Sequence, residues 1–100
     1  MVDWHRLAGF DWDAGNVRKS SDKHDVTQAE AEQVFFNEPL LMLPDERHSV
    51  GEVRIHALGR TDGKRLLHIT FTLRQGETKL RVISARDMSR KERRYYEQST

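Results

Sequence analysis

Three arginines lie close together in the stretch FTLRQGETKLRVISAR, which runs from Phe71 to Arg86. They are Arg74, Arg81 and Arg86. Segments 71–73 and 80–84 carry β-branched and aromatic residues, and Gln75-Gly76 between them is typical of a turn, so the stretch predicts a β-hairpin. Guanidinium groups fixed on neighbouring strands form a rigid cationic surface that suits two-pronged binding of phosphate. Taken singly, each arginine is more often a solvated strand residue.

Two predicted strands, 52–58 and 66–73, alternate between apolar and polar residues. This alternation gives each strand one apolar side and one polar side. If the polar sides align, one sheet surface carries Glu52, Arg54, His56, His68 and Arg74. The next strand, 79–85, does not alternate cleanly, so the sequence does not assign Arg81 and Arg86 to a side.

The elements that would position these residues follow from capping residues and periodicity. Asp13 is a candidate N-cap for a helix over 14–23, and the capping box from Thr27 to Glu30 begins a second helix that Pro39 ends. Strands are expected at 40–43, 52–58, 66–73 and 79–85, and a last helix runs from the cap at Ser89 to Gln98. The sequence thus predicts an α+β fold with two N-terminal helices, a four-stranded antiparallel sheet and a C-terminal helix. We expect one domain over residues 1–100, with 1–8 and 99–100 as flexible ends.

Composition favours a soluble, surface-rich chain. Of its 100 residues, 36% are hydrophobic and 33% are charged, and it has no cysteine, which excludes disulfides and thiolate metal sites. No apolar run approaches the roughly 18 residues of a membrane span, and the N-terminus lacks the apolar core of a secretory signal. We therefore expect a bacterial cytoplasmic location.

The net charge of +1 conceals two halves of opposite sign. Residues 1–59 hold 6 Lys/Arg and 11 Asp/Glu, which gives −5, whereas residues 60–100 hold 11 Lys/Arg and 5 Asp/Glu, which gives +6. A basic half attracts polyanions through phosphate contacts and counterion release. Charge alone indicates a nucleic acid and an acidic protein partner about equally.

Six short motifs occur in a characteristic order along the chain. They are FDWD (10–13), KH (23–24), HSxxExR (48–54), FTxR (71–74), RxISAR (81–86) and KERxxYE (91–97). In this order and spacing, over roughly residues 9–98, the chain resembles the BrnT family, the toxin half of bacterial two-gene toxin–antitoxin pairs. The resemblance implies a RelE-like fold and RNA cleavage that stops translation.

The resemblance also implies a set of site residues. The family's motif positions correspond to Lys23, His24, Glu52, Arg54, Arg74, Arg81 and Arg86. RNA cleavage without a metal ion needs a base for the ribose 2′-OH, an acid for the leaving 5′-oxygen and cations for the phosphoryl charge. Glu52 is a candidate base, and His24 a candidate base or acid. Further RNA-contacting candidates are His48, His56, His68 and Tyr96.

Each of these residues has a structural alternative. Glu52 and Arg54 can form an ion pair worth about 0.2–1 kcal/mol and no activity. His56 and His68 suggest a metal pair, but no third ligand is evident. Phe10 and Trp12 are expected to be packing residues. We therefore predict neither a metal nor a cofactor.

The expected partner, by resemblance, is an antitoxin of the ribbon-helix-helix type. Two toxins and two antitoxins are expected to form a complex that represses its own operon, so that operator DNA is bound only through the antitoxin. Two other interpretations remain open: a non-catalytic RNA- or protein-binding domain, and an inactive toxin that acts as a transcriptional cofactor of the antitoxin.

Three positions around the first helix depart from the commonest family pattern. Asp25 stands where glycine would suit a left-handed helix end, Ser20 where asparagine is frequent, and Asn16 where lysine is frequent. These departures put the contribution of the first helix to the site in doubt. The strand motifs are unaffected.

Overall fold

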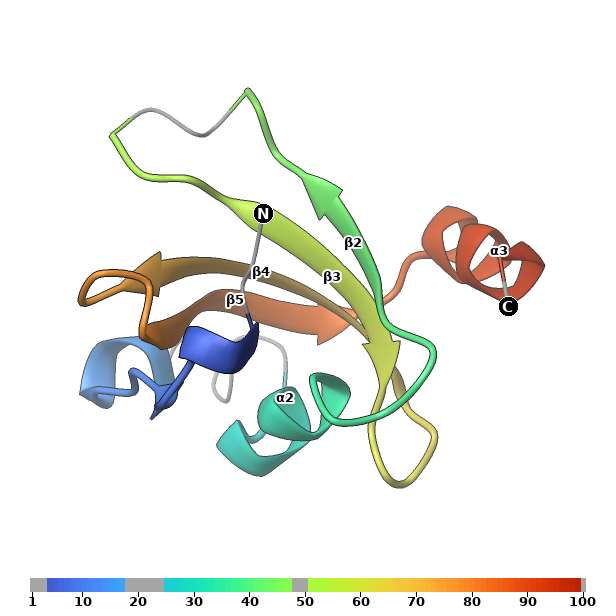
Figure 1. Ribbon diagram of the computed structural model, residues 1–100. Coiled ribbons are helices and arrows are strands. Elements are labelled where there is room, and N and C mark those ends of the chain that lie inside the picture. Colours follow the sequence, from blue (N-terminus) through green and yellow to red (C-terminus); the bar gives the residue numbers. More distant parts are fainter. Residues whose placement is uncertain (1–3, 18–24, 48–50, 100) are drawn as a thin grey trace.

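A five-stranded mixed sheet with strand order β1-β5-β4-β3-β2 forms the centre of the protein (Figure 1). The structure is a computed structural model, and it describes residues 4–17, 25–47 and 51–99. The elements are a 3-10 turn η1 (Trp4–Arg6), β1 (Gly9–Phe10), α2 (Gln28–Val34), β2 (Leu41–Pro44), β3 (Ile55–Arg60), β4 (Leu66–Arg74), β5 (Lys79–Asp87) and α3 (Arg90–Gln98). Residues 14–17 are also helical.

The expectation of a four-stranded antiparallel sheet is wrong, although the α+β class holds. The fifth strand, β1, pairs in parallel with β5 through Gly9–Lys79 and Phe10–Leu80. Backbone bonds from Ala8 N to Thr78 O and from Asp11 N to Leu80 O extend this pairing. A two-residue strand is too short to show alternation, and its only regular partner lies some seventy residues away in sequence. The sequence pattern therefore contained no local signal for it.

The capping residues predicted from the sequence are confirmed. The side chain of Asp13 accepts hydrogen bonds from the backbone of Gly15 and Asn16. Thr27 and Ser89 each form a complete capping box at the start of α2 and α3. These side chains satisfy backbone N–H groups that have no partner within the helix.

Helix α2 ends earlier than predicted, at Val34 rather than just before Pro39. The chain turns so that Phe35 packs edge-to-face on Phe71, with ring centroids 5.2 Å apart. The side chain of Asn37 then donates to Arg60 O at 3.0 Å. Tertiary contacts of Phe35 and Asn37 therefore replace the last turn that the sequence predicted.

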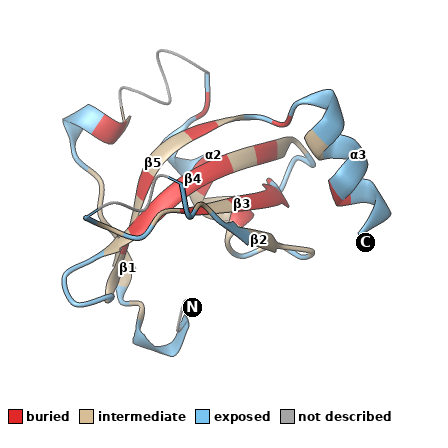
Figure 2. Cartoon of the chain, turned by 90° about the horizontal axis from the view of Figure 1, so that it is seen from above, coloured by how far each residue is buried: buried red, intermediate tan, exposed pale blue. Residues whose placement is uncertain are grey.

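The main core lies between α2 and one face of the sheet. Figure 2 shows the buried residues concentrated along β3, β4 and β5. Fully buried members of this cluster include Val26, Ala31, Val34, Ala57, Leu67, Ile69, Phe71 and Val82. Phe10 and Trp12 pack against it, as predicted. The opposite face of the sheet is left with the polar side chains.

Helix α3 packs over one end of that opposite face. A second small cluster joins Leu58, Met88 and Tyr96, and Leu58 belongs to the same side of β3 as His56 because the two alternate. The Tyr96 hydroxyl donates to Pro39 O at 2.6 Å. Of the two adjacent tyrosines, Tyr95 is exposed. The rest of the polar face stays uncovered by α3.

A β-bulge in β5 decides which side chains share the polar face. Thr70 pairs with Ser84, but the next residue of β4, Phe71, pairs with Val82, so Ile83 is an extra residue on β5. One extra residue reverses the alternation beyond it. Arg81 and Arg86 consequently lie on the same face. The irregular sequence pattern of this strand had not assigned either residue to a side.

Candidate functional site

The polar face of the sheet brings together residues from three adjacent strands. Cross-strand partners point to the same side of a sheet, and the pairs are His56–Thr70, Thr70–Ser84, His68–Arg86 and Thr72–Arg81. Arg74 lies on the same side as Thr72, because the two alternate along β4. The polar sides of β3 and β4 therefore align, which is the condition that the sequence pattern left open.

A small hollow of about 250 Å³ on this face collects four of the predicted site residues. They are Glu52, Arg54, Arg74 and Arg81. Glu52 Oε2 lies 3.0 Å from Arg74 Nη2, so its carboxylate pairs with a guanidinium from β4. Both side chains remain partly exposed, at 33% and 44%, which leaves them accessible to a ligand.

Arg81 is held at the wall of this small hollow by two carboxylates. Its Nη2 lies 3.0 Å from Asp13 Oδ2, and its Nη1 lies 3.6 Å from Asp11 Oδ2. The Asn16 backbone N–H, followed by the Arg81 guanidinium, lowers the pKa of the Asp13 carboxyl. This arrangement fixes the direction of Arg81 before any ligand arrives.

Asn16 connects the helical residues 14–17 to the sheet through hydrogen bonds. Its buried side chain donates to Asp11 O at 3.0 Å and to Val82 O at 3.1 Å, and it accepts from Asp13 N at 2.7 Å. A lysine, frequent at this position in the resembled family, would not make this set of bonds, because an ammonium cannot accept a hydrogen bond. In this chain Asn16 therefore has a structural role beside the site.

A second, larger hollow of about 540 Å³ adjoins the first, and Arg54 and Ile83 line both. Its other lining residues are Asp45, Arg47, His56, Thr70 and Ser84. His56 Nε2 lies 3.0 Å from Asp45 Oδ2, and His56 Nδ1 lies 2.8 Å from Thr70 Oγ1. The larger hollow therefore contains an imidazole held by partners on both sides.

The ring of His68 lies beside that of His56, with centroids 4.7 Å apart and the planes tilted by 41°, but its surroundings differ. Burial and then the nearby Arg86 charge lower the pKa of His68, so its imidazole is neutral near pH 7. Its Nε2 lies 3.7 Å from Glu92 Oε2, and its buried Nδ1 has no hydrogen-bond partner among the residues that the structure describes. Of the two histidines, His56 has the better-defined hydrogen bonds.

Arg86 and Tyr96, which the sequence predicted for the site, line neither hollow. Lys23, His24 and His48 lie outside the residues that the structure describes. Arg86 lies on the polar face but is bound to Glu92 of α3. Tyr96 is 4% exposed and its hydroxyl donates a hydrogen bond to Pro39 O, so it is a packing residue in this arrangement. We leave Tyr96 out of the site.

Sequence reasoning also missed residues of the site. Asp45, Arg47 and Thr70 line the larger hollow but stand in none of the six motifs, and Ser84 lies in the RxISAR motif but was not predicted as a site residue. Thr70 and Ser84 could have been found from the pairing of β4 with β5, had the bulge been known. Asp45 follows Pro44 at the end of an edge strand and gave no sequence signal.

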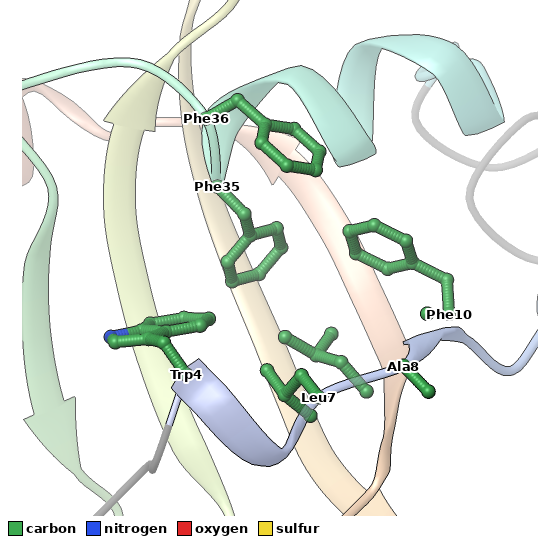
Figure 3. Close-up of a pocket in the computed structure, with 8 residues that line it drawn as sticks. Trp4, Leu7, Ala8, Phe10, Phe35 and Phe36 are labelled. Atoms are coloured by element: carbon green, nitrogen blue, oxygen red, sulfur yellow. The ribbon is translucent and has the colours of Figure 1, made fainter.

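The aromatic groove on the other side of the molecule is chemically different (Figure 3). Its volume is about 420 Å³, and it is lined by Trp4, Leu7, Ala8, Gly9, Phe10, Phe35, Phe36 and Leu80. Phe36 is 78% exposed there. The groove offers apolar contact but no side chain that moves a proton, so it is not the candidate site.

Within residues 4–17, 25–47 and 51–99, no group of three or more histidines and carboxylates is placed to hold a metal ion. Over the same ranges, no helix has both the length and the apolarity that crossing a membrane requires.

The two hollows together provide a carboxylate, an imidazole and several guanidiniums on one open surface. Such a set can bind a phosphodiester and move protons at its oxygens.

A search of curated proteins finds none that matches this chain. The profile of one family, described as the ribonuclease toxin BrnT of a type II toxin–antitoxin system, matches residues 12–92. The chain therefore belongs to the BrnT family of ribonuclease toxins, whose type II systems pair each toxin with an antitoxin.

Proposed function

We propose that this protein cleaves RNA at the small hollow of the polar face without a metal ion, and that the cleavage stops translation. The observation that supports this most directly is the convergence of Glu52, Arg54, Arg74 and Arg81 on one hollow from three segments of the chain: the segment before β3, strand β4 and strand β5. Family membership supplies the reaction class. The residues of the hollow supply a carboxylate and three guanidinium groups for that reaction.

The proposed roles follow from the geometry. Glu52 takes the proton from the ribose 2′-OH, since it is the carboxylate that lines the small hollow. Arg54, Arg74 and Arg81 bind the phosphoryl oxygens, whose negative charge grows as the 2′-oxygen attacks. The Glu52–Arg74 ion pair keeps the base and one cation together before RNA binds.

The antitoxin that the family implies is proposed to be a DNA-binding protein of the ribbon-helix-helix type. Two toxins and two antitoxins would form the inactive complex, and that complex would repress the operon. Light scattering of the purified complex measures the stoichiometry. A mass corresponding to one toxin and one antitoxin would contradict the two-and-two assembly.

The experiment that tests the cleavage uses the purified chain, freed from antitoxin, with total RNA in EDTA. Arg74→Ala and Glu52→Ala should abolish cleavage while circular dichroism stays native. Arg94→Ala is the matched control, because it removes an exposed guanidinium from α3 rather than from the hollow. Full cleavage by Arg74→Ala would remove that residue from the mechanism.

Expression of the same variants in cells tests the consequence. Growth arrest and loss of protein synthesis should accompany RNA cleavage and disappear with it. Intact RNA together with normal growth for the wild-type chain would instead favour a binding domain or an inactive toxin that acts through the antitoxin. Intact free RNA with growth arrest would show that cleavage requires the ribosome or another factor.

A further inference from the structure

His56 is held in one orientation by two hydrogen-bonding partners. Asp45 Oδ2 lies 3.0 Å from Nε2, and the Asp45 side chain is only 11% exposed. Thr70 Oγ1 lies 2.8 Å from Nδ1. The imidazole itself is 28% exposed and lines the larger hollow. An oriented and accessible imidazole is suited to proton transfer, because histidine is the side chain that most often serves as a general acid or base.

The position of His56 relative to Glu52 suits His56 to protonating the leaving group while Glu52 acts as the base. Glu52, Arg54 and His56 occupy alternate positions of one chain segment. Glu52 and Arg54 line the small hollow, whereas Arg54 and His56 line the larger one. Arg54 therefore stands between a carboxylate and an imidazole. Displacement at phosphorus places the attacking and leaving oxygens on opposite sides of the phosphate, which is the arrangement these three side chains offer.

We propose that His56 is the general acid of the RNA cleavage and that Asp45 is its positioning residue, an inference that rests on the proposed ribonuclease function. Glu52 accepts the 2′-OH proton, and the 2′-oxygen forms a bond to phosphorus. The bond between phosphorus and the 5′-oxygen breaks, and that oxygen keeps the electron pair and takes the Nδ1 proton of the His56 imidazolium. The products are a 2′,3′-cyclic phosphate and a 5′-hydroxyl end.

Thr70 occupies the place of the leaving oxygen in the absence of RNA. In an imidazolium both ring nitrogens carry protons, so Nε2 donates to Asp45 while Nδ1 donates to the Thr70 hydroxyl. The 5′-oxygen replaces that hydroxyl when RNA is bound. After proton transfer, Nδ1 of the neutral ring accepts a hydrogen bond from the Thr70 hydroxyl, and Nε2–H still donates to Asp45.

Charged and titratable groups surround His56 on several elements. Asp45 and Arg47 belong to the segment after β2, Arg54 precedes β3, and His68 lies on β4. Arg86 of β5 pairs across the sheet with His68. The carboxylate that faces His68, Glu92, lies 3.7 Å from Nε2, beyond hydrogen-bond distance, and the His68 side chain is less exposed, at 12%. We therefore assign the acid role to His56 rather than to His68.

The test compares two leaving groups within each variant. One short RNA carries an ordinary scissile linkage, and the other carries sulfur in place of the bridging 5′-oxygen. A thiolate leaves without being protonated, so loss of the acid matters only for the oxygen linkage. His56→Gln should cleave the oxygen linkage about 100-fold or more slowly than the wild-type protein. On the sulfur linkage, the same variant should recover most of the wild-type rate. Because the ratio of the two rates is taken on one preparation, partial unfolding cancels.

Two further variants sharpen the assignment. Asp45→Asn should show the same pattern as His56→Gln with a smaller loss. His68→Gln is the matched control: it removes the neighbouring imidazole, and its ratio of rates should equal that of the wild-type protein. On the oxygen linkage, the wild-type rate should fall on the alkaline side of its pH profile, and His56→Gln should lack that fall.

The outcomes separate the two proposals. Equal losses on both linkages for His56→Gln would overturn the acid role and leave the ribonuclease function standing. A sulfur-specific rescue of His68→Gln instead of His56→Gln would also overturn it. A wild-type protein that cleaves neither linkage would contradict the ribonuclease proposal itself, and with it this inference.

Discussion

Glu92 and Arg86 form a two-pronged ion pair where β5 meets α3. Glu92 Oε1 lies 2.8 Å from Arg86 Nη1, and Oε2 lies 2.9 Å from Nη2. Glu92 also completes the capping box at Ser89. The Glu92 carboxylate therefore stabilises the first turn of α3, binds α3 to β5 through Arg86, and neutralises the charge of that arginine on the polar face.

Substituting Glu92 by glutamine should isolate the ion pair, because glutamine keeps the capping box. We expect the free energy of unfolding to fall by about 1–2 kcal/mol, since both partners are partly exposed to solvent. Glu92→Ala should cost about 1 kcal/mol more because it also removes the hydrogen bond that the Glu92 side chain accepts in the capping box. Urea unfolding followed by circular dichroism measures both. A glutamine variant as stable as the wild type would show that the pair contributes nothing.

The acid dependence of stability should report the same pair. Hydrogen bonds from Arg86 lower the pKa of Glu92 to about 2, from 4.5 for an unperturbed glutamate. Above pH 4.5 the carboxylate is charged in both states and its stabilisation is complete. As the pH falls from 4.5 towards 2, the unfolded chain takes up the proton first, so stability is lost. Urea unfolding over this interval should show a shallower loss for Glu92→Gln than for the wild type.

Asn16 should be important for stability although it lies beside the site. Asn16→Ala removes three hydrogen bonds in a buried position and should lower the free energy of unfolding by about 1–3 kcal/mol. Thermal unfolding measures the change. Exposed Ala14 offers a comparison, and Ala14→Ser should change little. Equal stability of the Asn16 variant and the wild type would contradict the anchoring role.

Gly59 should not tolerate a side chain. A Cβ at this position would lie 2.7 Å from Val34 Cγ1, so α2 would have to move away from β3. Gly59→Ala should therefore destabilise the fold by about 1–3 kcal/mol. Gly63→Ala is the matched control, because its Cβ would meet Thr61 Oγ1 at an ordinary 3.8 Å. Similar unfolding midpoints for the two variants would show that α2 accommodates the methyl group freely.

Arg81→Gln should reduce RNA cleavage with little effect on the fold. The guanidinium is held by Asp13 and Asp11 in the direction of the small hollow, so its loss removes a prearranged cation. Removing one such donor costs on the order of 100-fold in rate. Single-turnover cleavage measures it, with Arg60→Gln as the control for a guanidinium outside both hollows. An unchanged rate for Arg81→Gln would exclude the residue from the reaction.

Local patterns in the sequence determined much of this protein. Capping residues at Asp13, Thr27 and Ser89 set helix starts, because capping depends on residues only two or three positions apart. Alternation along β3 and β4 predicted one polar face, since the side-chain period of a strand is fixed by its backbone. The motifs that resemble the family included four of the residues that line the small hollow, Glu52, Arg54, Arg74 and Arg81.

The tertiary structure alone decided the remainder. The parallel pairing of β1 with β5, the bulge at Ile83 and the approach of Asp45 to His56 each depend on segments that are distant in the sequence. None of them leaves a periodic trace in the sequence. The bulge has the largest effect: without the extra residue, strict alternation would put Arg81 and Arg86 on opposite faces of the sheet.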